Sequence, residues 1–154
     1  MNLILEKTDQ VPFFTNMALV FNALGVSAAD YDWYVSDIET NCPKSMFSQN
    51  NQWISGRELQ ERLDNSDIQF MWAVFSAVPK GVHFIVETPP YSHDNPSYWR
   101  EEDVQPQLEG ALFEIVCWDS SATILIGLPA AAEASFIRAF PDTRPLVSVA
   151  QRHG

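Results

Sequence analysis

The spacing of apolar positions along the chain predicts alternating strands and helices. Short runs rich in aromatic and β-branched residues predict strands over residues 2–6, 31–38, 68–78, 82–87, 111–118 and 121–127. Apolar residues that recur every three to four positions predict helices over residues 13–24, 56–63 and 130–140. The first helix has Thr8 or Asp9 as a possible N-cap and Gly25 as its stop. Ser55 and Glu58 have the spacing of a capping box at the start of the second helix.

Two hairpins are expected from the turn residues. The stretch 68–78 is apolar at both odd and even positions, which predicts a strand covered on both faces of a sheet. Pro79-Lys80-Gly81 would then turn the chain into a returning strand over 82–87. Asp119-Ser120 would form a tight turn between the last two strands. In the final helix we expect Phe136, Ile137 and Phe140 to dock on the sheet.

These elements predict an α+β domain. We expect a single domain over residues 1–154, with a mainly antiparallel sheet of about five to six strands packed with about three helices. No internal repeat or Gly/Ser linker divides the chain. Residues 89–107 form the longest irregular segment, and long loops in small domains are often functional.

Composition narrows the classes of partner. The chain has 154 residues, 46% hydrophobic and 19% charged, as globular proteins do. Nine Lys and Arg against 20 Asp and Glu give a net charge of −11, which argues against nucleic acid or an anionic membrane as the main partner. No apolar run has the length of a membrane span or the flanks of a signal peptide, and two cysteines are too few for a disulfide framework. We therefore expect a cytoplasmic protein.

No motif predicts a catalytic residue, a cofactor or a metal site. The glycines are isolated, so no phosphate-binding loop is present, and the three histidines are scattered. Cys117 lies among apolar residues, which is typical of a buried thiol that acts as a small hydrophobe. Glu114 is the only ionisable residue in the same strand. It would either act as a general acid or base, or face solvent or pair with a Lys or Arg.

Two patches combine aromatic and acidic residues and are candidates for partner binding. Aromatic side chains contribute buried area at interfaces, and acids steer a basic partner. The first patch could equally be a solvated strand edge whose aromatic rings face the core. The candidates are Asp32, Trp33, Asp37 and Glu39 in the first patch, and Tyr98, Trp99, Glu101, Glu102 and Asp103 in the second.

Four segments together resemble small bacterial proteins of the kind that includes immunity proteins of polymorphic toxin systems. They are YDWYVSDIETN, WISGRELQERL, QFMWAVFSAVP and FEIVCWDSSATILIG, and the resemblance runs from about Tyr31 to Pro141. It implies a bacterial cytoplasmic protein that binds and neutralises a cognate toxin, and it assigns no residue roles.

Three functional hypotheses follow. The first is a non-enzymatic acidic module that occludes a basic protein partner, such as a toxin, as an immunity protein does. The second is a small hydrolase that uses Glu114, His83 or Cys117 in a pocket on the sheet, near Glu114 and Cys117. The third is a structural subunit that dimerises through a sheet edge or a Trp-rich surface. The sequence leaves the oligomeric state open.

Overall fold

The elements follow the order expected of an α+β chain. The structure is a computed structural model that describes residues 1–11, 15–41, 47–65, 68–100 and 103–149. Within these residues the strands are β1 (Leu3–Glu6), β2 (Asp32–Thr40), β3 (Gln52–Ser55), β4 (Phe70–Val78), β5 (Phe113–Trp118), β6 (Ala122–Ile126) and β7 (Arg144–Pro145). The helices are α1 (Met17–Leu24), α2 (Gly56–Asn65) and α3 (Ala130–Ala139), with short 3-10 helices η1 (Ala28–Asp30), η2 (Pro96–Trp99) and η3 (Leu146–Val149).

The strands form one sheet in the order β3-β2-β4-β5-β6-β1-β7. Each neighbouring pair of strands runs antiparallel. The α+β class, the antiparallel sheet and the three α-helices in the described part of the chain confirm the prediction. The sheet has seven strands, more than the five to six expected.

The expected strand over residues 82–87 is wrong, and its place in the sheet explains why. One edge of β4 pairs with β2, where Val78 faces Asp32, and the other pairs with β5, where Ala77 faces Phe113. Both edges of β4 are therefore occupied, and the residues that follow it have no edge to return to. The short strands β3 and β7 are the two that the apolar pattern did not predict.

The first helix begins later than its apolar spacing indicates. Asn16 is its N-cap, and its side chain accepts a hydrogen bond from the backbone N–H of Leu19 at 3.3 Å. Thr15 has a φ of 64°, in the left-handed region, so the helix does not continue toward the N-terminus. The expected N-cap at Thr8 or Asp9 is therefore wrong, and residues 12–14 lie outside the described residues. Gly25 ends the helix as predicted, with a φ of 71°.

The second helix starts in direct contact with the backbone of η1. The Ser55 hydroxyl oxygen accepts from the Glu58 N–H at 3.2 Å, which confirms one half of the predicted capping box, whereas the Glu58 carboxylate accepts from Arg62 at 2.8 Å instead of from the Ser55 N–H. A Cβ atom on Gly56 would lie 2.0 Å from the carbonyl oxygen of Tyr31, so this close approach requires glycine.

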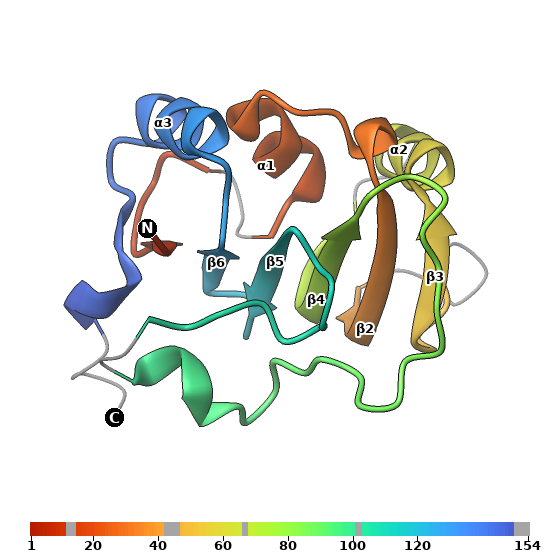
Figure 1. The fold of residues 1–154 in the computed structure, drawn as a ribbon. Helices are drawn as coiled ribbons and strands as arrows, with labels where there is room; N and C mark the ends of the chain where they lie inside the picture. Colours follow the sequence, from red (N-terminus) through yellow and green to blue (C-terminus); the bar gives the residue numbers. More distant parts are fainter. Residues whose placement is uncertain (12–14, 42–46, 66–67, 101–102, 150–154) are drawn as a thin grey trace.

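All three α-helices cover one face of the sheet (Figure 1). Their apolar residues pack on side chains from the middle strands, with the indole of Trp33 fully buried at the centre. The Trp33 ring makes edge contacts with Phe21 and Phe113, at centroid distances of 5.2 and 5.8 Å. In α3, Phe136 docks as predicted, but the prediction for Ile137 is wrong because its side chain is exposed.

The opposite face of the sheet is covered by irregular chain. The β4–β5 connection, as we call residues 79–112, carries η2; its described part first descends beside β3 and then runs beneath the strands in Figure 1. Tyr98, Trp99 and Leu108 of this connection are buried against that face. The prediction that β4 is covered on both faces is therefore confirmed. The tight turn at Asp119-Ser120 is also confirmed, since both residues have positive φ and Ser121 N–H donates to Trp118 C=O at 2.9 Å.

Candidate functional site

The β4–β5 connection is fixed to the sheet at three carboxylates. Asp32 and Asp37 extend from β2, and Glu114 extends from β5. Each of them accepts hydrogen bonds from backbone N–H groups of the connection. Such bonds to a charged acceptor are about twice as strong as neutral ones. The carboxylates therefore determine the path of a long segment that forms almost no regular secondary structure.

Asp32 holds the beginning of the connection. Its Oδ1 accepts from the Gly56 N–H at 3.2 Å, while its Oδ2 accepts from the Gly81 N–H at 3.0 Å and lies 3.0 Å from Nε2 of His83. Burial opposes ionisation of this carboxyl, but the hydrogen bonds from Gly81, Gly56 and His83 together outweigh it and hold its pKa below the ordinary value. The His83 ring also stacks on Trp53, with centroids 4.6 Å apart.

Asp37 holds the middle of the connection from a bulge in β2. Its φ of 55° falls where the pairing of β2 with β4 shifts register between Ser36 and Glu39. Asp is among the residues that tolerate this conformation. Its Oδ2 accepts from the Ser92 N–H at 2.8 Å, the Ser92 hydroxyl at 3.2 Å and the His93 N–H at 2.8 Å.

Glu114 holds the end of the connection and is fully buried. Its carboxylate accepts from the Ser76 hydroxyl at 2.6 Å, the Gln107 N–H at 2.6 Å and the Leu108 N–H at 3.0 Å. Burial raises the pKa of this carboxyl above its ordinary value, although all three donors favour the charged form. Glu114 therefore does not face solvent, and among the described residues it pairs with no Lys or Arg, so that expectation is wrong.

Between these anchors the connection exposes apolar side chains. Ile85 is 92% exposed, and Val82, Phe84 and Tyr91 are also exposed large hydrophobic residues. A groove of about 370 Å³ lies alongside, between residues 84–88 and 107–109, with Glu87 and Glu109 among its lining residues. Several exposed apolar groups on one fixed segment are typical of an interaction site. We call residues 82–91 together with 107–109 the connection surface.

The sequence did not single out this surface. The residues 82–86 are apolar enough to be assigned to a buried strand, and nothing local indicates that β4 has no edge for them. The double proline at 89–90 ends the run, which was the available signal that these residues do not continue a strand.

The candidate partner-binding residues lie in different environments. Trp33 and Tyr98 have no exposed surface, and Trp99 and Asp32 are buried, so these four serve the core or the anchoring of the connection. Asp37 is half-buried, and its carboxylate is occupied by Ser92 and His93. The exposed candidates are Glu39 and Asp103, while Glu101 and Glu102 lie outside the described residues. A role in partner binding stays a prediction for Glu39 and Asp103, and equally for Glu101 and Glu102.

The residues suggested for a hydrolase are not brought together. The Glu114 carboxylate lies on the face covered by the connection, whereas Cys117 packs in the core beneath the helices, with its Sγ 3.8 Å from Sδ of Met17. Burial raises the pKa of the Cys117 thiol well above its ordinary value. His83 lies at Asp32. In the described ranges no three His, Cys, Asp or Glu side chains are placed to hold a metal ion.

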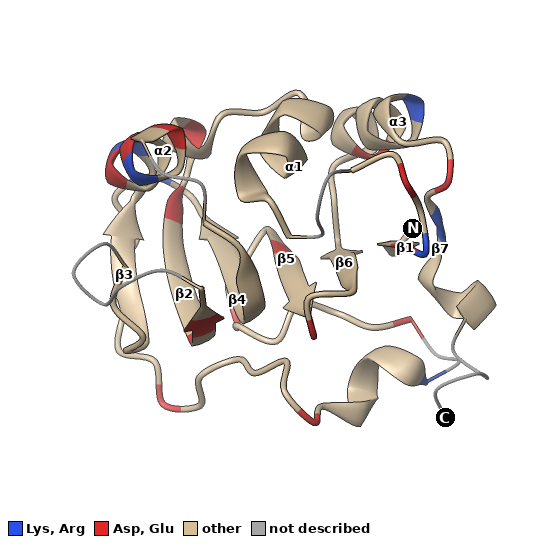
Figure 2. Cartoon of the chain, turned by 180° about the vertical axis from the view of Figure 1, so that it is seen from behind, with Lys and Arg blue, Asp and Glu red and all other residues tan. Residues whose placement is uncertain are grey.

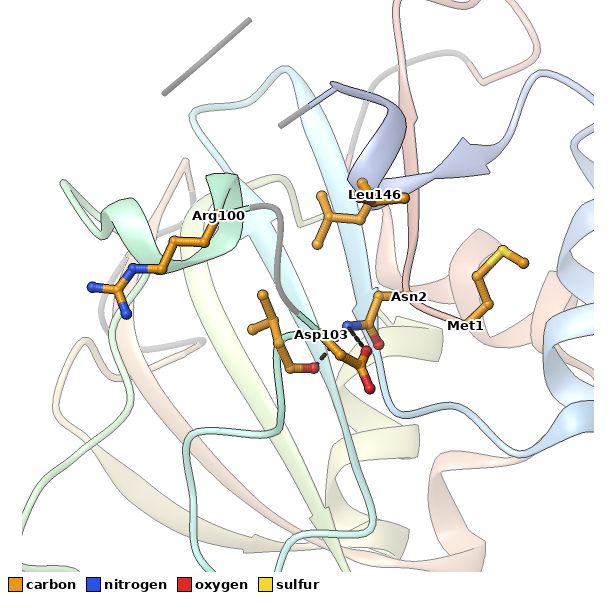
Figure 3. A pocket seen from close by; sticks show the side chains of 7 residues that line it. Met1, Asn2, Arg100, Asp103 and Leu146 are labelled. Carbon is orange, nitrogen blue, oxygen red and sulfur yellow. Dashed lines mark hydrogen bonds between the residues drawn. The ribbon is translucent and has the colours of Figure 1, made fainter. Parts of the chain in front are cut away.

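A second hollow lies between the N-terminus and η3 (Figure 3). It has a volume of about 230 Å³, and Asn2, Arg100, Asp103 and Leu146 are among its lining residues. The Asn2 amide donates to the Val104 carbonyl at 2.7 Å and to Asp103 at 3.4 Å. This amide therefore holds the end of the connection in place, as the three carboxylates do elsewhere.

No family model matches the chain, and no curated protein or solved structure matches it. In the described residues, no helix is both long and apolar enough to cross a membrane.

Proposed function

We propose that this protein is a non-enzymatic binding module for a basic protein and that the connection surface is its contact site. The observation that carries the proposal is the 92% exposure of Ile85 on a segment whose path is fixed by the carboxylates of Asp32 and Asp37. Exposing a large apolar side chain to water is unfavourable, and a fixed backbone reduces the entropy lost on binding. Both features favour a partner that covers this residue.

The charge around the surface favours a basic partner. No Lys or Arg occurs between Lys80 and Arg100, while Glu87 and Asp94 lie in that stretch and Glu109 lines the groove. Figure 2 shows acidic positions along this part of the connection. With a net charge of −11, the chain would attract a cationic protein over about one Debye length, roughly 10 Å at moderate salt.

A toxin of the source bacterium is the partner that we propose, with the module acting in the cytoplasm as an immunity protein. The support is the resemblance of the four segments described above, together with the acidic charge. Toxins that act on nucleic acid need basic clefts to bind phosphates, and an acidic surface with an apolar centre can occlude such a cleft.

The test begins with affinity capture from a lysate of the source organism, washed in rising salt. A basic protein that is recovered in a one-to-one ratio with this protein is then purified. Its binding is measured to the wild-type chain and to matched variants of the chain. Ile85→Ser should weaken binding about tenfold, mainly through faster dissociation, and Glu87→Lys should slow association most at low salt. Ile137→Ser and Glu61→Lys are the controls, because both residues are exposed on helices on the other side of the sheet.

Two results would contradict the proposal. One is a captured partner whose affinity is the same for the connection variants as for the helix variants. The other is a partner whose toxicity in a co-expression assay is not relieved by the wild-type chain, which would reject the immunity role alone.

A further inference from the structure

Residues 83–87 resemble a strand that has no partner. In the part of the chain that the structure describes, none of their backbone N–H groups donates a hydrogen bond. The segment is nevertheless rich in β-branched and aromatic residues, which strongly favour a sheet. Unpaired backbone in such a sequence is a template for pairing with another chain.

From Phe84 to Glu87 the side chains alternate as they do in an extended strand, whereas the His83 ring before them also contacts Trp53. Phe84 and Val86 contact the body of the protein, where Phe84 meets Trp53 at a centroid distance of 5.2 Å and Val86 packs against the cluster around Tyr34. Ile85 is 92% exposed, against 37% for Phe84, and Glu87 is exposed as well. Residues 84–86 therefore have the side-chain period of a half-buried strand although they pair with no strand, and the segment runs beside β3 (Figure 1).

One edge of the segment is occupied, and the other faces away. The Phe84 carbonyl accepts from the Trp53 indole N–H at 3.1 Å. Successive residues of an extended chain direct their backbone groups to opposite edges. Before the chain bends at Glu87, the N–H and C=O groups of Ile85 therefore point away from Trp53, and no described residue pairs with them.

The segment is also held ready for pairing. The Asp32 carboxylate contacts Gly81 before the segment and His83 at its first position, and the Asp37 carboxylate fixes Ser92 and His93 after it. A partner strand would therefore meet a backbone whose ends are already ordered, which reduces the entropy lost on binding.

We infer that the partner contributes an extended cationic strand that pairs with the backbone of residues 83–87 and lies along the groove edged by Glu87 and Glu109. This inference rests on the proposed function and specifies how the partner is recognised. Charge favours a basic partner strand over a second copy of this chain, because two molecules of net charge −11 would repel each other. A strand with alternating Lys or Arg would instead place cations beside Glu87 and Glu109.

The probe for this inference is a blocked peptide of alternating lysine and valine, titrated to about 2 mM into the isotope-labelled full chain at low salt. We expect amide shifts and slowed hydrogen exchange at residues 83–87. The same peptide with N-methyl groups on alternate amides keeps its charge but loses donors on one edge, and it should bind about fivefold more weakly. A peptide of alternating glutamate and valine should not bind.

A pair of variants isolates the backbone contribution on the protein side. Ile85→Pro and Ile85→Thr both remove the exposed apolar side chain, but only proline removes the N–H. Because this N–H donates to nothing in the described residues, the proline variant should fold, which its thermal transition will check. The lysine–valine peptide should bind Ile85→Pro about fivefold more weakly than Ile85→Thr.

Equal binding by the methylated peptide, or by the two variants, would overturn strand pairing and leave the proposed function intact. Absence of any shift with the lysine–valine peptide would also overturn it, while the capture experiment still decides the proposed function separately. A dimer in sedimentation that protects residues 83–87 would show a second copy as the occupant and likewise overturn the inference.

Discussion

Glu114→Ala tests whether a buried carboxylate anchors the connection. The substitution removes the acceptor for Ser76, Gln107 and Leu108. The Leu108 N–H is buried, so leaving it without a partner costs about 1–3 kcal/mol, while the half-buried Gln107 N–H can bind water instead. The carboxylate itself is destabilised by burial, which offsets part of the loss. We expect the free energy of unfolding to fall by about 2 kcal/mol.

Urea denaturation measures this loss, and amide hydrogen exchange locates it. The Leu108 and Gln107 amides should exchange faster in the variant, whereas amides in β6 should change only with global stability. Glu109→Ala is the matched control, because this neighbouring carboxylate is exposed. The reasoning is refuted if both variants lose the same stability, or if the Leu108 amide remains as protected as in the wild type.

Three further predictions concern the pH dependence of Glu114, the anchor Asp37 and the buried thiol of Cys117. The pKa of Glu114 is raised in the folded state, so the stability of the wild type relative to Glu114→Gln is greatest below about pH 4.5. This stability difference should fall as pH rises through the folded-state pKa of Glu114. An increase with pH in urea denaturation would show that the pKa is not raised. Asp37→Ala should cost about 1–2 kcal/mol more than Asp37→Asn, which keeps an acceptor oxygen and tolerates positive φ; equal urea midpoints would reject this. With Cys42 replaced by Ser, Cys117 should react with a thiol reagent at least about a hundredfold more slowly in the folded chain than in urea, because burial raises the pKa of its thiol.

Most strands of the sheet could be predicted from the sequence, because each has a recognisable local pattern of apolar and turn residues. The β4 strand is apolar on both faces, and the turn at Asp119 and Ser120 has residues that tolerate positive φ. The local pattern gave a wrong prediction where pairing between distant strands determines the structure. The apolar run at 82–87 has the composition of a strand, but β4 already pairs along both edges, and only the topology shows this.

The candidate site was less predictable for a related reason. The pattern of acids and aromatic residues identified Asp32 and Asp37 but could not show which way they face. Both lie on the side of β2 that the connection covers, so they bind this chain's own backbone. Glu114 was noticed as an isolated acid, yet its partners come from residues seven or fewer positions earlier and from β4, a combination that requires the folded sheet.

The anchoring of the connection has a consequence for how this protein can diversify. Asp32, Asp37 and Glu114 bind mainly backbone N–H groups, at Gly81, at Ser92 and His93, and at Gln107 and Leu108. A main-chain donor is present whatever side chain a residue carries, proline excepted. Mutations at outward positions such as Ile85 and Glu87 can therefore change binding preference while the segment keeps its course. The scaffold and its recognition residues are free to evolve at separate rates, as in antibody loops on a constant framework.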